Sequence, residues 1–330
     1  MARRPPTNPV SDVDRLDHPR YWLTWIGTLL WRLVSVFPSR IRWIVGHVLG
    51  LALYHLLPAR RRVAARNIDA CFTQWSVKRR RRLLKDHFAS VGQSVFDLGV
   101  AVWSTSSRFH GMVRVEGISH LQQARARNRP VILLAPHFVT LPISALYLIE
   151  LQPIIAMYKR PRNQLVHAGY RRVCNGSTTS NALLDRLIRK RNSTHELKLV
   201  EHRRGMRPIV RALRSGVAFY YLPDQDLGRR HAVFAPFFGI EAATVTAVSR
   251  FASLTDALVI LCWSRQLPFG SGYEINFSEP LHDFPSNDEQ RDAERINLHI
   301  EEIVRNIPEQ YFWLHKRFKT RPVGDTPFYE

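Results

Sequence analysis

The sequence is poor in cysteine and in acidic residues. Its 330 residues hold three cysteines, Cys71, Cys174 and Cys262, an odd and scattered set. Such a set excludes a disulfide-stapled scaffold and lacks the paired spacing of a zinc site, which favours a reducing compartment. Asp and Glu number 27 against 48 Lys and Arg, so the formal charge is +21. The surface should therefore attract acidic or phosphate-bearing partners.

The sequence also has no apolar run that clearly meets the length of a membrane span, which is about 20 residues. The run at 21–38 is borderline and is interrupted by Arg32, and the run at 43–58 falls short and carries two histidines. Both runs contain Trp or Tyr, which collect at membrane interfaces, and basic clusters follow at 60–66 and 78–82.

These features predict a polar tail over 1–20 and then a membrane anchor or interfacial helical hairpin over 21–58. The alternative for 21–58 is a pair of amphipathic helices in a soluble core. A secretory signal peptide fits poorly, because the apolar part begins about twenty residues in and no small-residue cleavage site follows.

The remaining residues, 59–330, alternate short apolar runs with helical periodicity. This alternation predicts an α/β domain in which helices flank a mostly parallel or mixed sheet. A turn-rich, polar stretch at 164–180 is interpreted as a surface insertion. The predicted strands are 130–135, 153–157, 217–222, 257–263 and 273–277, and the predicted helices are 76–103, 141–151, 182–191, 206–215, 243–253 and 288–306.

One histidine stands out by its position. His137 directly follows the predicted strand 130–135 and precedes a predicted helix. Loops at the carboxyl ends of strands are where α/β sheets place active sites. A neutral imidazole there can take a proton from a hydroxyl near neutral pH. The alternative is an exposed loop histidine.

Two more polar clusters follow predicted strands in the same way. Asp224, Gln225 and Asp226 follow the strand 217–222, where they could orient a histidine, hold a metal, accept ligand hydroxyls or simply form a tight turn. Three cations follow the strand 153–157 and could hold phosphate: Lys159, Arg160 and Arg162. Polar clusters at successive strand ends predict one shared site.

The aromatic strip 233–239 is predicted to pack in the core by default, or else to form one wall of an acyl-chain pocket.

Several blocks of sequence together resemble a known family. They are YWLTW at 21–25, RNI at 66–68, CF at 71–72, APHF at 135–138, ALRSG at 212–216, YLPDQD at 221–226, VFAPFFG at 233–239, AT at 243–244 and PEQYFWLHKRFKTRP at 308–322. In this order they make the chain similar to the late acyltransferases of lipid A biosynthesis, the lauroyl/myristoyl transferase family within the lysophospholipid acyltransferase group.

The resemblance implies a membrane-anchored enzyme of the bacterial inner membrane, with a glycerol-phosphate-acyltransferase-like α/β domain on the cytoplasmic side. Such an enzyme moves a fatty acyl group from acyl carrier protein, or from acyl-CoA, to a hydroxyl of a phosphorylated glycolipid in lipopolysaccharide biosynthesis. It implies no metal and no cofactor besides the carrier thioester. The expected partners are acyl carrier protein, the glycolipid acceptor and anionic membrane lipid. Nucleic acid is not expected, since that alternative rests on charge alone.

The family's signature is a histidine followed five residues later by an acid, and here His137 is followed by Pro142. Glu150 lies about 12 Å further along a helix, at 1.5 Å per residue, too far to substitute. The resemblance implies that His137 is the general base, that backbone N–H groups at the following helix start steady the oxyanion, and that Arg160 contacts the acceptor. Asp224 or Asp226 could supply the missing carboxylate. The alternative is a catalytically impaired relative that binds lipid without turnover.

Overall fold

A seven-stranded sheet forms the centre of the molecule. The computed structural model describes residues 19–158, 161, 163–175, 195, 197–201 and 205–330. The strands of the sheet are β1 (Val113–Glu116), β2 (Val131–Leu134), β3 (Ile154–Tyr158), β4 (Leu197–Glu201), β5 (Ala218–Tyr221), β8 (Leu258–Gln266) and β9 (Tyr273–Pro280).

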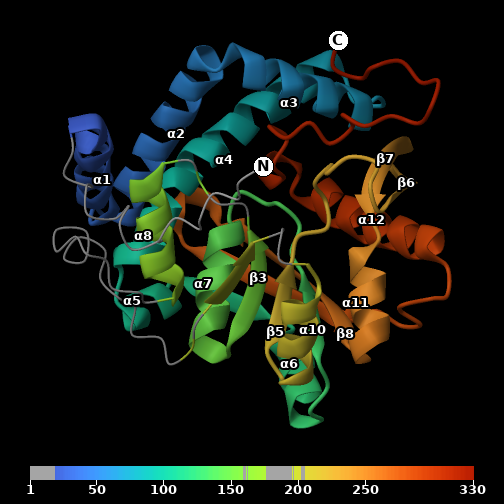
Figure 1. Cartoon of the computed structure of the whole chain (residues 1–330). Helices are drawn as coiled ribbons and strands as arrows, with labels where there is room; N and C mark the ends of the chain where they lie inside the picture. Colours follow the sequence, from blue (N-terminus) through green and yellow to red (C-terminus); the bar gives the residue numbers. More distant parts are fainter. Residues whose placement is uncertain (1–18, 159–160, 162, 176–194, 196, 202–204) are drawn as a thin grey trace, which may run out of the picture.

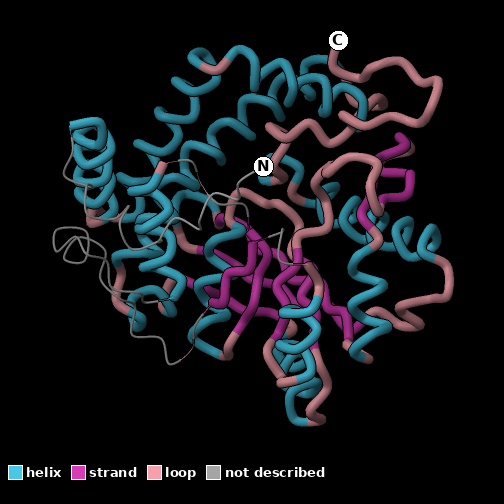
Figure 2. Tube along the Cα trace, in the orientation of Figure 1, coloured by secondary structure: helices cyan, strands magenta, loops and turns pink. Residues whose placement is uncertain are grey.

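The strand order is β1-β9-β8-β2-β5-β3-β4. The strands from β8 to β4 are parallel, β9 runs antiparallel to β8, and β1 is parallel to β9. This confirms the predicted mostly parallel, mixed sheet, visible in magenta at the centre of Figure 2. Because β2, β3, β5 and β8 are parallel, their carboxyl ends all lie at one edge.

Helices cover both faces of this sheet. They are α1 (Trp22–Ser35), α2 (Ser39–Leu56), α3 (Pro58–Cys71), α4 (Val77–Trp103), α5 (Ser106–His110), α6 (Ile118–Ala126), α7 (Leu141–Leu151), α8 (Gln164–Asn175), α10 (Arg207–Arg214), α11 (Ala247–Thr255) and α12 (Glu289–Asn306), with short 3-10 turns η1 (Pro19–Tyr21), η3 (Pro268–Gly270) and η4 (Pro308–Gln310). Side chains of β2 alternate between two cores: Val131 and Leu133 pack with α5, α6 and α7, whereas Ile132 and Leu134 pack with α3, α4 and α10 to α12.

The predicted apolar N-terminal segment folds into α1 and α2, which lie against α4 (Figure 1). Helices α2 and α4 cross closely, because a Cβ on Gly92 would overlap backbone atoms of Gly46 and Gly50. Both N-terminal helices expose large apolar side chains: Trp22, Leu23, Ile26, Leu29, Leu30 and Leu33 on α1, and Ile41, Ile44, Val48 and Leu51 on α2. None of the described helices is by itself long and apolar enough to span a bilayer, and α2 with α3 qualifies only across a 96° bend. The membrane anchor therefore stays a prediction.

Two elements differ from the sequence-based predictions. The stretch predicted to be turn-rich is helical over Gln164–Asn175, as α8, while 176–180 and the predicted helix 182–191 lie outside the described residues. The predicted helix 243–253 begins only at Ala247, because Ile240–Val245 is strand β7. It pairs with β6 (Ala232–Phe237) across a turn whose two residues both have positive φ, which is hairpin geometry.

Candidate active site

Parallel pairing of two neighbouring strands brings His137 and Asp224 together. In the register of β2 and β5, Leu134 lies opposite Tyr221, and the pairing continues with the Ala135 N–H donating to the Tyr221 carbonyl at 2.8 Å. His137 and Asp224 each follow three residues after this matched pair. They therefore leave the same edge of the sheet at equivalent positions.

The two side chains form a close pair in which Asp224 is buried and His137 is half-buried. The His137 ring Nδ1 lies 2.6 Å from Asp224 Oδ1, and the His137 backbone N–H donates to Asp224 Oδ2 at 2.8 Å. Burial alone would raise the pKa of Asp224, but the charge and hydrogen bonds of His137 hold it below its ordinary value. Asp224 is thus an ionised acceptor. In the uncharged form of the His137 ring it holds the ring proton on Nδ1 and leaves a basic lone pair on Nε2.

Gln225 caps that lone pair in this conformation. Its Nε2 lies 2.8 Å from His137 Nε2, and with the proton held on Nδ1 the amide must be the donor. The cavity at this point is about 10 Å³, room for one water at most. A hydroxyl can therefore reach Nε2 only when the Gln225 side chain gives way.

The opposite wall of this cavity comes from the C-terminal part of the chain. The Phe312 N–H donates to the His137 carbonyl at 2.8 Å, and the Val139 N–H donates to the Gln310 carbonyl at 2.9 Å. Figure 1 shows this segment, in red, returning beside α3. In the sequence, residues 308–322 are one of the blocks that carry the family resemblance, but none of them is predicted to belong to the site. The sequence of this block carries one sign of a functional role, because polar and charged side chains interrupt a strongly aromatic run.

Two of the overlooked side chains carry chemistry. Burial lowers the pKa of His315 to about 4, so this ring is neutral at physiological pH, and its Nε2 accepts from the Asp226 N–H at 3.1 Å. Arg317 is buried and donates to the Ala243 carbonyl, to Thr244 Oγ1 and to Asn297 Oδ1 at 2.8, 3.0 and 3.2 Å. Arg317 therefore places a fixed positive charge at the cavity.

Asp226, the other candidate for the missing carboxylate, does not contact His137. Asp226 accepts from the Thr320 N–H at 2.6 Å and from Thr320 Oγ1 at 2.8 Å, so it ties the C-terminal segment to the loop after β5. Glu150 pairs with His110 Nε2 at 2.7 Å, away from His137, as its distance along the helix predicts. Lys159, Arg160 and Arg162 lie outside the described residues.

Most of the backbone N–H groups at the start of α7, where the oxyanion donors were expected, are engaged in the structure. The N–H groups of Phe138, Leu141 and Ile143 donate to the Pro136, Phe138 and Thr140 carbonyls, and Val139 is engaged by Gln310. Pro142, in the first turn of α7, has no N–H to give. These donors are thus occupied by the tight turn that connects β2 to α7.

A second, apolar cavity is lined in part by residues that lie close in sequence to His137 and Asp224. Its volume is about 310 Å³, and its walls come from α1, α4, α7, α8 and the strands β3 to β5. Leu141 and Pro142 line it four and five residues after His137, and Leu222 lines it two residues before Asp224. The aromatic strip 233–239 contributes no wall to this cavity, and only part of it packs in the core, through Phe237 and Phe238. Helix α8 instead supplies Leu165, Val166 and Gly169.

A carboxylate-oriented imidazole can activate a hydroxyl, and an apolar cavity a few residues away accepts a hydrocarbon chain. This combination suits an enzyme that acts on an acyl group, as acyltransferases do. The chain belongs to the bacterial lipid A biosynthesis acyltransferase family, whose model matches residues 12–320.

Relatives from one organism illustrate the family. The lipid A biosynthesis palmitoleoyltransferase of Escherichia coli (strain K12) is 32% identical over 314 residues, covering 94% of this chain and 96% of that protein. The lauroyltransferase of the same organism is 31% identical over 309 residues, covering 93% and 94%. The myristoyltransferase is 27% identical over 321 residues, covering 95% and 92%. The names of these relatives specify three different acyl groups.

Proposed function

We propose that this protein transfers a fatty acyl group from an acyl carrier protein thioester, or from acyl-CoA, to a hydroxyl of a phosphorylated glycolipid in a late acylation step of lipid A biosynthesis. In this proposal His137 is the general base, and Asp224 takes the place of the acid that Pro142 displaces. The observation that carries it is the 2.6 Å contact between His137 Nδ1 and Asp224 Oδ1.

The proposed reaction needs one proton acceptor and no metal. After Gln225 moves aside, His137 Nε2 takes the proton of the acceptor hydroxyl as its oxygen attacks the thioester carbonyl. The tetrahedral intermediate then collapses, the C–S bond breaks, and the thiolate takes the proton back from the imidazolium. Asp224 stabilises that imidazolium and keeps the ring in the basic tautomer.

The apolar cavity is the proposed site of the acyl chain. Its lining residues Leu141, Pro142 and Leu222 lie close in sequence to the two catalytic side chains, so a chain in the cavity would present its carbonyl carbon near His137. The absence of an acid at position 142 is also consistent with an acyl chain in this cavity. A carboxylate at position 142 would line an apolar cavity, where an unpaired charge is costly.

The exposed apolar faces of α1 and α2 support attachment to the surface of the bacterial inner membrane, with the α/β domain on the cytoplasmic side. The net charge of +21 would attract both anionic lipid and an acidic carrier protein. Lys159, Arg160, Arg162 and Gln225 remain the proposed contacts of the acceptor and its phosphate. The impaired-relative alternative rests on Pro142 alone, and the contact between Asp224 and His137 weakens it.

Acyl transfer by the detergent-solubilised chain tests the proposal. The assay contains acylated carrier protein and an under-acylated lipid A precursor, and mass spectrometry detects the product. His137→Ala should abolish turnover, whereas His282→Ala, a change at a histidine on the exposed surface, should leave it intact. Equal rates for the unmodified protein and His137→Ala would refute a catalytic role for His137.

A further inference from the structure

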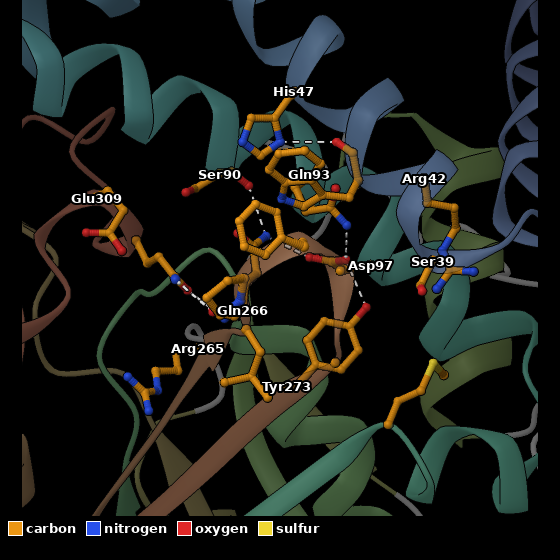
Figure 3. A pocket seen from close by; sticks show the side chains of 18 of the residues that line it. Ser39, Arg42, His47, Ser90, Gln93, Asp97, Arg265, Gln266, Tyr273 and Glu309 are labelled. Atoms are coloured by element: carbon orange, nitrogen blue, oxygen red, sulfur yellow. Dashed lines mark hydrogen bonds between the residues drawn. The ribbon is translucent and has the colours of Figure 1, made fainter.

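Two further cavities lie apart from the apolar cavity and from the catalytic cavity, the small space beside His137. One has a volume of about 350 Å³ and lies between α2, α4 and the turn from β8 to β9. Its two buried charges offset each other, because burial lowers the pKa of Arg42 and the charge of Asp97 opposes that shift. Figure 3 shows Asp97 between Tyr273 and Arg42. The other cavity differs, since its charges are not offset in this way.

This other cavity, the basic groove, is an open groove of about 640 Å³ between α3 and the C-terminal residues. Four cations line it, Arg60, Arg62, Arg66 and Lys316, against one acid, Glu330. All four cations are exposed, and the ion pairs found among the described residues are made by other side chains. A surface of exposed cations without counterions attracts an anionic partner.

The cations lie on both sides of the basic groove. Arg62 and Arg66 project from one face of α3, because they are four residues apart. The Arg66 Nε donates to the Phe328 carbonyl at 3.1 Å, which holds the side chain in place without neutralising its charge. Lys316 comes from the C-terminal segment, where its Nζ lies 5.4 Å from the centre of the Tyr329 ring. An acidic element lying along α3 would therefore meet positive charge on two sides.

The basic groove and the catalytic cavity share a wall. Arg66 lines the groove, and the next residue, Asn67, lines the catalytic cavity. In the same way Lys316 lines the groove and His315 lines the catalytic cavity. The Asn67 Nδ2 donates to the His315 carbonyl at 2.9 Å, which joins α3 to the C-terminal segment. An anion in the groove thus lies across this wall from His137.

The three cavities follow one another in the order basic groove, catalytic cavity, apolar cavity. In Figure 1, α3 and the C-terminus lie to one side of the sheet edge that carries the site, and α1 and α8, which wall the apolar cavity, lie to the other. An acyl thioester on a carrier protein has the same order: the acidic protein, the pantetheine arm that ends in the thioester, and the hydrocarbon chain. The two orders match when the thioester is placed at His137.

Charge beyond the basic groove favours a partner of protein size. The ion pair between Arg80 and Asp69, at 2.8 Å, joins the start of α4 to the end of α3. Lys78, Arg79 and Arg81 are exposed there. Exposed cations therefore occur at both ends of α3, a length of about 20 Å at 1.5 Å per residue, which is longer than the nucleotide of acyl-CoA.

We propose that the basic groove is the docking surface for an acidic acyl carrier protein. The inference rests on the proposed function and adds the face from which the donor approaches. Carboxylates of the carrier pair with Arg62, Arg66 and Lys316. The pantetheine arm crosses the wall at Asn67, and the acyl chain continues past His137 into the apolar cavity.

Calorimetric titration of the detergent-solubilised chain with lauroyl-carrier protein tests this surface. Arg62→Gln/Arg66→Gln should weaken binding of the carrier by about fivefold at low salt, which is the scale of two exposed ion pairs. Lauroyl-CoA, titrated in parallel, should bind to this variant and to the unmodified chain alike. Because binding is measured without turnover, an inactive chain would refute the proposed function while the titration still decides the docking surface.

Arg211→Gln/Arg214→Gln is the matched control for the loss of two positive charges. It removes two exposed cations of α10, one of which likewise donates to a carbonyl, that of Leu254 at 3.0 Å. This control should keep the full affinity for the carrier. Equal losses in the two double variants, or an unchanged carrier affinity in Arg62→Gln/Arg66→Gln, would overturn the docking surface. A matching loss of lauroyl-CoA affinity would exclude the carrier protein as the partner, in favour of a phosphate common to both donors.

Discussion

The proposed role of Asp224 in place of the motif acid leads to a quantitative prediction. Asp224→Asn keeps the shape of the side chain but removes the ionised acceptor. It would also favour the tautomer with hydrogen on Nε2, which cannot take a proton. The carboxylate now accepts two hydrogen bonds from His137, at 2.6 and 2.8 Å. Replacing the acid of a Ser-His-Asp triad by Asn costs about 10⁴ in kcat, and a single charge-assisted hydrogen bond is worth about 1.5–3 kcal/mol, so we expect kcat to fall by about 10² to 10⁴.

The assay is steady-state acyl transfer with the melting temperature measured in parallel. Asp226→Asn is the matched control, because it removes a buried carboxylate of the same loop that contacts Thr320 rather than His137. It should lower the melting temperature while costing far less kcat. Pro142→Glu should lower activity, because it places a carboxylate in the wall of the apolar cavity. A gain of activity in Pro142→Glu, with Asp224→Asn within tenfold of the unmodified chain, would refute the reasoning.

Three further predictions concern the acyl cavity, the helix crossing and pH. Ala145→Leu fills part of the apolar cavity, so the product mass should shift toward shorter acyl chains, at about 0.8 kcal/mol for each methylene that no longer fits; an unchanged chain profile would place the acyl group elsewhere. Gly92→Ala should lower the free energy of unfolding by about 1–3 kcal/mol in denaturant titration, because the added methyl meets the backbone of Gly50; the same change at exposed Gly27, whose Cβ would meet nothing, is the control. Burial lowers the pKa of His87 to about 4, so its contribution to stability is present above pH 6.5 and is lost as pH falls toward 4, by about 3 kcal/mol. Burial raises the pKa of Asp97 to about 6, which opposes that loss over the same range, so the stability of Asp97→Asn should fall more steeply between pH 6 and 4.

Local sequence patterns predicted the elements that carry the site. The predicted helix 141–151 has the bounds of α7, and the predicted strands before His137 and Asp224 agree with β2 and β5 to within one residue at each end. A shared site at neighbouring strand ends followed from topology alone. Topology alone does not decide whether Asp224 or Asp226 pairs with His137. That choice depends on the register of β2 against β5, which joins residues almost ninety positions apart.

The remaining parts of the site depend on contacts distant in sequence. The polar side chains within 308–320 suggest a site but do not indicate that this segment closes the cavity at His137, since its hydrogen bonds to His137 and Val139 span more than 170 residues. Helix α8 escaped prediction because its polar residues and Gly169 are typical of turns. Its apolar side chains Leu165 and Val166 become meaningful only once α1 and α7 lie beside them.

The return of residues 308–320 to the sheet edge sets an order of events during synthesis. A chain emerges from the ribosome with its N-terminus first. The exposed apolar surface of α1 and α2 is therefore available early, while His137 still lacks the wall that Phe312, His315 and Arg317 complete. Under the proposed function, catalytic competence would arise only when nearly the whole chain has been made, after the apolar surface of α1 and α2 is already available to contact a membrane.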